Sequence, residues 1–364
     1  MGVKFSDLKR TYELYAGEYE EAALRALRSG WYILGGELAS FEEHFSAYIG
    51  KRYCVGVGCG LDALIIAVRA LDIGAGDEVI VAGNTYIATV LGVTENGATP
   101  VFVDCNKWFQ IDETRIADAI TERTKAVLVT NLYGQSCDLT SVRRICDNYG
   151  LFMLEDCAQS HGSRWEGRMS GSFADISCFS FYPTKPLGAM GDAGACLTDD
   201  ETLAERMRML RNYGSKKKYV NDMCGINSRL DEEQAALLNV GLVHIEEMRA
   251  MRDAIAERYT TGICNDNVTL PEVRPGANSV WHIYPILCER RDELQAFLAD
   301  KSVATQIHYP IPPHKATCYR EEGFSRCQLP LAERYATQEL SLPIYAGMSD
   351  CDVEMVISAI NDFR

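Results

Sequence analysis

The chain has 364 residues, of which 47% carry hydrophobic side chains, enough for a substantial core and a second, smaller domain. Its 36 Lys and Arg stand against 51 Asp and Glu, giving a formal net charge of -15. This sign opposes binding to the phosphate backbone, so we do not expect a nucleic acid partner. No apolar run approaches the roughly 20 residues needed to cross a bilayer, and no secretion signal begins the chain. Fourteen scattered cysteines without a C-x-x-C pair fit reduced thiols, so we expect a cytoplasmic protein.

Short apolar runs alternate with amphipathic helical patterns over the first two-thirds of the chain. The expected strands cover residues 79–82, 100–103, 126–130, 152–155, 176–181 and 194–198. Runs that are apolar on both faces, such as 126–129, suit strands covered by helices on either side. The pattern predicts an α/β fold: a doubly wound, mainly parallel sheet flanked by helices.

A long helix is expected from residue 231 to about residue 260, where apolar side chains recur at helical spacing. An interruption is expected near Gly241. A stretch bearing Pro and Gly at 270–276 then precedes a mixed segment that runs to Arg364. We therefore predict a large domain over residues 1–245 and a smaller C-terminal α+β domain over residues 246–364.

Two familiar sites are not supported by their motifs. Gly56, Gly58 and Gly60 start a dinucleotide-like fingerprint, but Leu61 stands where that fingerprint needs glycine, which argues against a nicotinamide cofactor. None of the six histidines has a partner at metal-ligand spacing, so no metal site is expected.

Asp156 ends an apolar run at 151–154, and ligands of open α/β sheets gather at the carboxyl ends of strands. A carboxylate there can keep a pyridine nitrogen protonated, which makes the ring an electron sink. The alternative is a helix N-cap.

Lys185 follows the next expected strand, 176–181, and so reaches the same sheet edge as Asp156. Desolvation there would lower the pKa of its amine and expose a nucleophile. The alternative is a solvated surface charge.

Gly60 and Leu61 begin a helical pattern, and the free N–H groups of a helix start can hold a phosphate dianion. A glycine cap without a ligand is the alternative. Tyr86, just after the strand at 79–82, can lie against an aromatic ring. Its alternative role is packing.

Eight ordered segments of the chain together resemble the DegT/DnrJ-type sugar aminotransferases, a branch of the fold type I pyridoxal-phosphate enzymes. They are residues 55–64, 76–81, 132–135, 155–162, 179–185, 225–232, 307–310 and 340–343. The resemblance implies that Lys185 forms the internal aldimine and that Asp156 pairs with the pyridine nitrogen. It further implies cofactor-binding roles for Gly60, Leu61, Tyr86, Gln159, Ser180 and Asn227: Gln159 on the ring hydroxyl, Tyr86 stacked on the ring, and Gly60, Leu61 and Ser180 on the phosphate.

By the same resemblance, Asn227 reaches the cofactor phosphate of a neighbouring subunit, which implies a homodimer with shared active sites. An amino donor, expected to be glutamate, converts pyridoxal 5'-phosphate to pyridoxamine 5'-phosphate, and a nucleotide-linked keto sugar then takes the amine. Some relatives have histidine at the position of Lys185 and dehydrate their substrates, so the lysine indicates transamination.

The segments 60–64 and 209–215, with Lys218 and Tyr219, look most like the enzymes that aminate C3 of dTDP-linked 3-keto-6-deoxyhexoses. The candidate substrate-binding residues are Tyr182, Tyr213, Lys218, Tyr219, His308 and Tyr309. Two alternatives remain open at this point: amination at C4 of a 4-keto sugar, and a non-catalytic regulator that keeps the fold.

Overall fold

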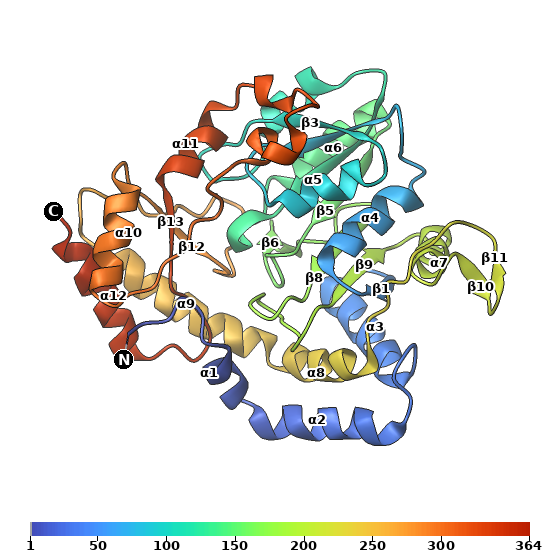
Figure 1. Ribbon diagram of the computed structural model, residues 1–364, viewed down its shortest axis with the longest axis horizontal. Coiled ribbons are helices and arrows are strands. Elements are labelled where there is room, and N and C mark those ends of the chain that lie inside the picture. The colour runs from blue at the N-terminus through green and yellow to red at the C-terminus, as the bar shows by residue number, and fades with distance from the viewer. Residues whose placement is uncertain (1) are drawn as a thin grey trace.

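Residues 2–364, which the computed structural model describes, contain a central seven-stranded sheet in the order β1-β9-β8-β5-β4-β2-β3 (Figure 1). Its strands are β1 (Tyr53–Val57), β2 (Glu78–Ala82), β3 (Thr99–Val103), β4 (Thr124–Thr130), β5 (Phe152–Asp156), β8 (Ile176–Ser180) and β9 (Gly194–Thr198). Neighbouring strands run parallel except at β9, which is antiparallel to both β1 and β8. The mainly parallel sheet and its six expected strands are confirmed, and β1 is an additional strand.

Helices cover both faces of this sheet. Alternate residues of a strand point to opposite faces, so Val79 and Val81 of β2 share a core with α4 (Gly60–Ala70), α5 (Ile87–Thr94) and α7 (Glu201–Leu210). Ile80 of the same strand faces α6 (Leu139–Tyr149). On that second face, α3 (Gly36–Ile49) and α8 (Glu232–Val243) cover the end of the sheet near β1.

Polar side chains fix where several helices begin. Asp138 caps α6 by accepting from the backbone N–H of Ser141, and Asp200 caps α7 by accepting from that of Leu203. Cys59 caps α4 through its sulfur, which accepts from the backbone N–H of Asp62. The start of α4 is thereby held in place at the sheet edge.

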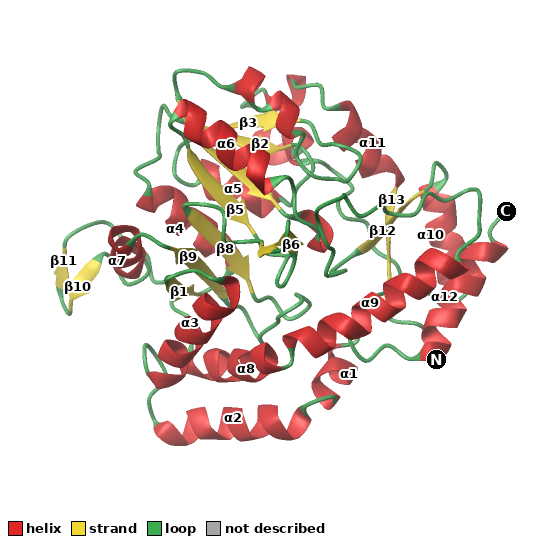
Figure 2. Ribbon diagram, turned by 180° about the vertical axis from the view of Figure 1, so that it is seen from behind, coloured by secondary structure: helices red, strands yellow, loops and turns green. Residues whose placement is uncertain are grey.

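The expected long helix is present but broken. It forms α8 and then α9 (Ile245–Gly262), with the break at His244 rather than at Gly241. Figure 2 shows α9 running from the sheet toward the C-terminal part of the chain.

A second core packs around α9. It contains α10 (Arg291–Asp300), α12 (Asp350–Asp362) and the antiparallel pair β12 (Tyr284–Leu287) and β13 (Glu339–Leu342). Val3 also belongs to this core, so the start of the chain packs against its end. We keep residues 1–245 and 246–364 as the proposed domains, with Val3 as the part of the first that packs in the core of the second.

The remaining α-helices and strands are shorter or peripheral. They are α1 (Leu8–Glu13), α2 (Ala16–Ser29), α11 (Pro330–Gln338), β6 (Arg164–Trp165), β7 (Arg168–Met169), β10 (Ser215–Lys217) and β11 (Val220–Asn221). Within residues 2–364, no helix is both long and apolar enough to pass through a bilayer. All fourteen cysteines are free.

Candidate active site

A cavity of about 870 Å³ lies at the carboxyl ends of β4, β5 and β8, beside the start of α4. Its volume falls in the range of about 300 to 1,000 Å³ that is usual for small-molecule sites. The structure brings ten of the candidate residues to its walls: Gly60, Leu61, Tyr86, Asp156, Gln159, Ser180, Tyr182, Lys185, His308 and Tyr309.

Asp156 is the last residue of β5, and its carboxylate is buried. Thr89 Oγ1 donates to its Oδ2 at 2.7 Å, and the backbone N–H of Ala158 donates to its Oδ1 at 3.1 Å. Burial raises the pKa of Asp156, while these two hydrogen bonds and the charge of Lys185 oppose the rise. The carboxyl group is thus held in a fixed orientation, and a positively charged partner in the cavity would favour its ionised form.

Thr89 lies at the end of a chain of buried hydroxyl groups. Its Oγ1 is 2.7 Å from that of Thr85, which is 2.9 Å from that of Thr130 at the end of β4. The sequence motifs did not single out these threonines, since their contacts join separate elements of the sheet edge. The network fixes the orientation of Thr89 and hence that of Asp156.

Lys185 lies in the loop after β8, and its backbone N–H donates to the carbonyl of Tyr182 at 2.8 Å. Desolvation lowers the pKa of its amine to about 8, and the charge of Asp156 acts in the opposite direction. At pH 7, one unit below this pKa, roughly a tenth of the amine is therefore unprotonated and nucleophilic.

The start of α4 approaches the end of β8 very closely. A Cβ atom added at Gly60 would lie 2.5 Å from Cβ of Ser180, so only glycine fits there. Ser228 accepts from the backbone N–H of Gly58 at 2.9 Å and donates to Asp62 at 2.6 Å, which ties the loop to the helix. The free N–H groups of the helix start and the Ser180 hydroxyl together form a suitable cradle for a phosphate.

Gln159 connects two other walls of the cavity. Its Oε1 accepts from the backbone N–H of Tyr133 at 2.6 Å, and its Nε2 donates to the hydroxyl of Tyr309 at 3.0 Å. The ring of Tyr309 lies 5.0 Å from that of Tyr86, centroid to centroid. These contacts place one amide and two aromatic rings on the walls of the cavity that Asp156 also lines.

His308 is held from the C-terminal part of the chain. Its backbone N–H donates to Oε2 of Glu339 at 2.6 Å, and its Nδ1 is 2.8 Å from Oγ of Ser341. Desolvation lowers the pKa of His308 to about 4, and the charge of Lys185 adds to this effect. The ring is therefore neutral at physiological pH. The family resemblance included Ser341, within residues 340–343, without giving it a role, and it did not include Glu339.

Four candidate residues do not line this cavity: Tyr213, Lys218, Tyr219 and Asn227. Lys218 and Tyr219 occupy the turn of the β10–β11 hairpin, which projects from the body of the molecule next to α7 (Figure 1). Tyr219 is 88% exposed. Within one chain, these residues are therefore separate from the cavity.

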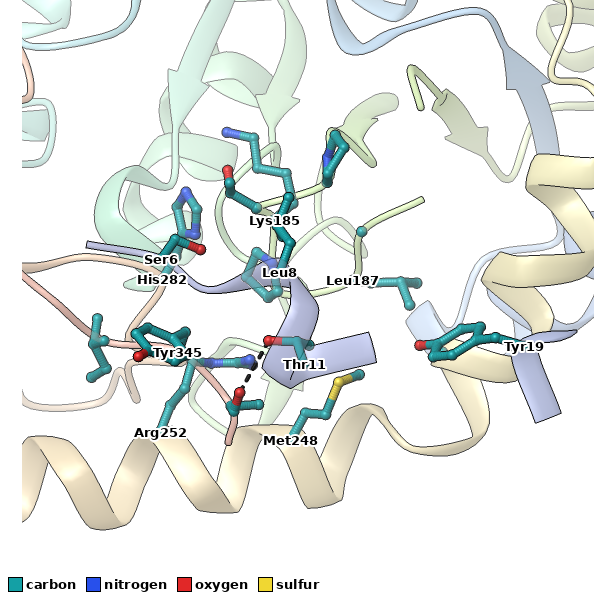
Figure 3. A pocket seen from close by; sticks show the side chains of 17 residues that line it. Ser6, Leu8, Thr11, Tyr19, Lys185, Leu187, Met248, Arg252, His282 and Tyr345 are labelled. Carbon is teal, nitrogen blue, oxygen red and sulfur yellow. Dashed lines mark hydrogen bonds between the residues drawn. The ribbon is translucent and has the colours of Figure 1, made fainter. Parts of the chain in front are cut away.

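A smaller cavity of about 70 Å³ lies next to Lys185 (Figure 3). Ser6, Lys185 and His282 line both cavities. Arg252 of α9 reaches the smaller one, and its Nε donates to the carbonyl of Val280 at 3.0 Å. Lys185 thus borders both cavities, and residues of α9 line the smaller one.

The residues of the larger cavity fit pyridoxal phosphate. An amine of lowered pKa suits its aldehyde, a buried carboxylate suits its ring nitrogen, and the cradle at Gly60, which a Cβ would fill, suits its phosphate. Among the described residues, no group of His, Cys, Asp and Glu could hold a metal ion.

Known proteins are similar to this chain in sequence and in structure over most or all of their length. The chain is 47% identical over 362 residues, 99% of both chains, to dTDP-3-amino-3,6-dideoxy-alpha-D-galactopyranose transaminase of Aneurinibacillus thermoaerophilus. Its structure is similar to that of Streptomyces venezuelae DesV in complex with a ketimine intermediate, with a TM-score of 0.97, 44% identity and coverage of 99% and 98% of the two chains. The fold and the site thus define an enzyme of the transaminase class.

The DegT/DnrJ/EryC1/StrS aminotransferase family matches residues 15–361, and the chain belongs to this family. A further similar structure, with a TM-score of 0.92 and 31% identity, is ntda from Bacillus subtilis with bound cofactor PMP. The match covers 99% of this chain and 84% of that one. The predicted family and the predicted aminotransferase activity are confirmed.

Proposed function

We propose that the protein transfers an amino group from glutamate to the C3 keto group of a dTDP-linked 3-keto-6-deoxyhexose, with pyridoxal phosphate as cofactor. The observation that carries the proposal is the convergence of Lys185 and Asp156 on one cavity beside the start of α4. The name of the A. thermoaerophilus relative, a dTDP-3-amino sugar transaminase, supports the position of the keto group and the nucleotide.

When bound, the cofactor supplies an electron sink that stabilises negative charge on the substrate carbon. Lys185 is the covalent anchor and, once released, the base that takes a proton at Nζ and returns it. A pKa of about 8 suits both directions of transfer near neutral pH. Asp156 keeps the ring nitrogen protonated. Because the carboxylate is buried, its attraction for that proton is little screened by water.

The other walls orient the cofactor and the sugar. Gly60, Leu61 and Ser180 hold the phosphate, Gln159 holds the ring hydroxyl, and Tyr86 stacks on the ring. The sugar enters over Tyr182, His308 and Tyr309, which line the same cavity. The family resemblance and the positions of these side chains on the cavity walls support these roles.

We further propose a homodimer in which each subunit completes the site of the other. Trp31, Tyr32, Ile33 and Leu34 form a run of exposed apolar side chains, with Trp31 64% exposed, and such a patch is typical of an interface. Ile33 pairs with Asp231 in a β-bridge, close in sequence to Asn227. A second copy covering this run would bring Asn227 near the partner's phosphate, and the exposed Tyr213, Lys218 and Tyr219 near the partner's sugar site. We place the enzyme in the cytoplasm.

The test uses purified protein loaded with pyridoxal phosphate. Glutamate and a 3-keto sugar nucleotide should give an amino sugar, whereas the 4-keto isomer should give none. Product from the 4-keto isomer alone would overturn the C3 assignment, and the absence of product from every keto sugar would support a non-catalytic regulator. Lys185→Ala should abolish turnover, so wild-type turnover in that variant would contradict the role of the lysine.

A further inference from the structure

A single buried carboxylate reaches His308 by two routes. Oε2 of Glu339 accepts from the backbone N–H of His308 at 2.6 Å. Its Oε1 accepts from the hydroxyl of Ser341, whose oxygen is also 2.8 Å from Nδ1 of the His308 ring. Glu339 and Ser341 are both fully buried. The carboxylate is therefore connected to the imidazole through one hydroxyl group that water does not reach.

The opposite nitrogen of the ring opens to the active site. His308 lines the 870 Å³ cavity. Within residues 2–364, Nε2 of His308 forms no hydrogen bond with the protein. It is also not one of the fully buried polar atoms without a partner. Because the pKa of His308 is lowered to about 4, the ring is neutral, with one donor and one acceptor nitrogen. Nε2 donates a hydrogen bond to a ligand when it carries the ring proton, and it accepts one when Nδ1 carries the proton.

The ionisation of Glu339 determines the direction of the hydrogen bonds. An ionised carboxylate only accepts, so Ser341 donates to it and accepts from Nδ1–H of His308. When Glu339 is protonated, Oε2 still accepts from the backbone N–H, and the proton resides on Oε1. The acid then donates to Ser341, which donates to Nδ1. In this second arrangement the ring proton is on Nε2.

We propose that Glu339 and Ser341 are positioning residues that set the tautomer of His308. Ionised Glu339 presents Nε2 to the cavity as a hydrogen-bond acceptor, and protonated Glu339 presents Nε2–H as a donor. The identity of the group that Nε2 meets, a hydroxyl or keto group of the sugar, rests on the proposed function. The coupling of Glu339, Ser341 and His308 does not depend on that function.

Glu339 titrates in an accessible pH range. Burial raises its pKa to about 8, opposed by the hydrogen bonds from Ser341 and His308 and by the charge of Arg291. Arg291 of α10 donates to the backbone carbonyl of Glu339 at 3.2 Å. The other titratable groups that interact with Glu339 are the phenols Tyr133 and Tyr309, both neutral here because burial raises their pKa values. The switch is expected between about pH 7 and pH 9, within one pH unit of this pKa.

The test follows the ring nitrogens of His308 directly. Full-length enzyme labelled with ¹⁵N on histidine is loaded with pyridoxal phosphate, kept free of sugar, and observed by NMR from pH 6.5 to 9.5, roughly the range that brackets the titration. The His308 signal is assigned by its loss in His308→Gln. Wild-type protein should show Nδ1–H at high pH and Nε2–H at low pH.

Two variants make the coupling specific. In Glu339→Gln the amide oxygen accepts from the His308 backbone and the amide nitrogen donates to Ser341, so the ring should stay Nε2–H at every pH. Ser341→Ala removes the connecting hydroxyl, so the pH dependence should disappear. One tautomer in wild-type protein across the range, or an unchanged pH response in Ser341→Ala, would overturn the proposal. If Glu339→Gln fails to fold, the wild-type titration and Ser341→Ala still decide.

A kinetic measurement tests the link to the substrate. In wild-type enzyme KM for the keto sugar should change with pH by about tenfold more than in Ser341→Ala, the size of one hydrogen bond to a ligand. The titration of Lys185 is common to both proteins and cancels in this comparison. A merely structural role for Ser341 would alter KM equally at all pH values, and that result would overturn the role in sugar binding. If no keto sugar is turned over, the proposed function fails, and the NMR result still tests the coupling by itself.

Discussion

Replacing Gly60 with alanine tests the phosphate cradle. The new Cβ would lie 2.5 Å from Cβ of Ser180 and 3.0 Å from its Oγ. An ordinary carbon contact needs about 3.5 Å or more, so α4 and β8 must separate by about 1 Å. Such overpacking costs about 1–3 kcal/mol. The shift moves the helix start away from Ser180, and we expect the dissociation constant of pyridoxal phosphate to rise roughly 5- to 150-fold, the equivalent of that energy.

Gly36→Ala is the matched control. Gly36 begins α3 as Gly60 begins α4, but a Cβ there meets nothing within 4 Å. Because alanine favours the helix over glycine by about 1 kcal/mol, the control should be as stable as wild type or slightly more so. The assay is spectrophotometric titration of the cofactor-free variants with pyridoxal phosphate. Wild-type affinity in Gly60→Ala, with Gly36→Ala also unchanged, would refute the cradle.

Three further predictions concern the charges and the interface. Asp156→Asn should lower turnover by about two to three orders of magnitude, comparable to losing one preorganised electrostatic contact. Thr89→Val should cause a smaller loss. Equal turnover rates for the wild type, Asp156→Asn and Thr89→Val would contradict the role of the carboxylate. The rate at which cofactor-free protein takes up pyridoxal phosphate should increase as pH rises through about 8, because only the neutral amine of Lys185 reacts. In Asp156→Asn the midpoint of this pH dependence should move to lower pH, since the carboxylate raises the pKa of Lys185. A wild-type midpoint near 10.5, the ordinary pKa of a lysine, would refute the desolvation of Lys185. Trp31→Ser should shift the protein toward monomer in analytical ultracentrifugation, with Tyr149→Ser, another exposed aromatic, as the control; an unaltered dimer would count against the proposed interface.

The sequence predicted those features that depend on local patterns. Apolar runs of strand length located six strands of the sheet, and the position of Asp156 at the end of β5 follows from the run before it. The start of α4 at Gly60 was also expected. These residues are determined by periodicity and by the rule that parallel strands end at one edge.

Contacts between distant segments could not be predicted in this way. Thr89 and Asp156 are 67 positions apart, and His308 and Ser341 are 33 apart. Nothing in the pattern around Thr89 distinguishes it from a packing residue of α5. The requirement for glycine at position 60 likewise depends on Ser180 across the sheet edge. Only the folded chain shows which side chains hold the candidate catalytic groups.

Similarly, the sequence does not show which candidates act within one chain. Tyr182 and His308 line the cavity, whereas Tyr213 and Tyr219 do not. All four residues were selected by resemblance to the family. Such a resemblance concerns residue type, and it does not say whether a residue acts in the site of its own chain or in that of another. The positions of Tyr213 and Tyr219 away from the cavity show only that they do not line the site of their own chain.

The most direct test of the central claim is to identify the lysine that binds the cofactor. The protein loaded with pyridoxal phosphate is reduced with borohydride, digested, and its peptides are sequenced by mass spectrometry. The pyridoxyl group should be found on Lys185, and the yield should fall to background in Lys185→Ala. A pyridoxyl group on another lysine, with Lys185 unmodified, would contradict the account.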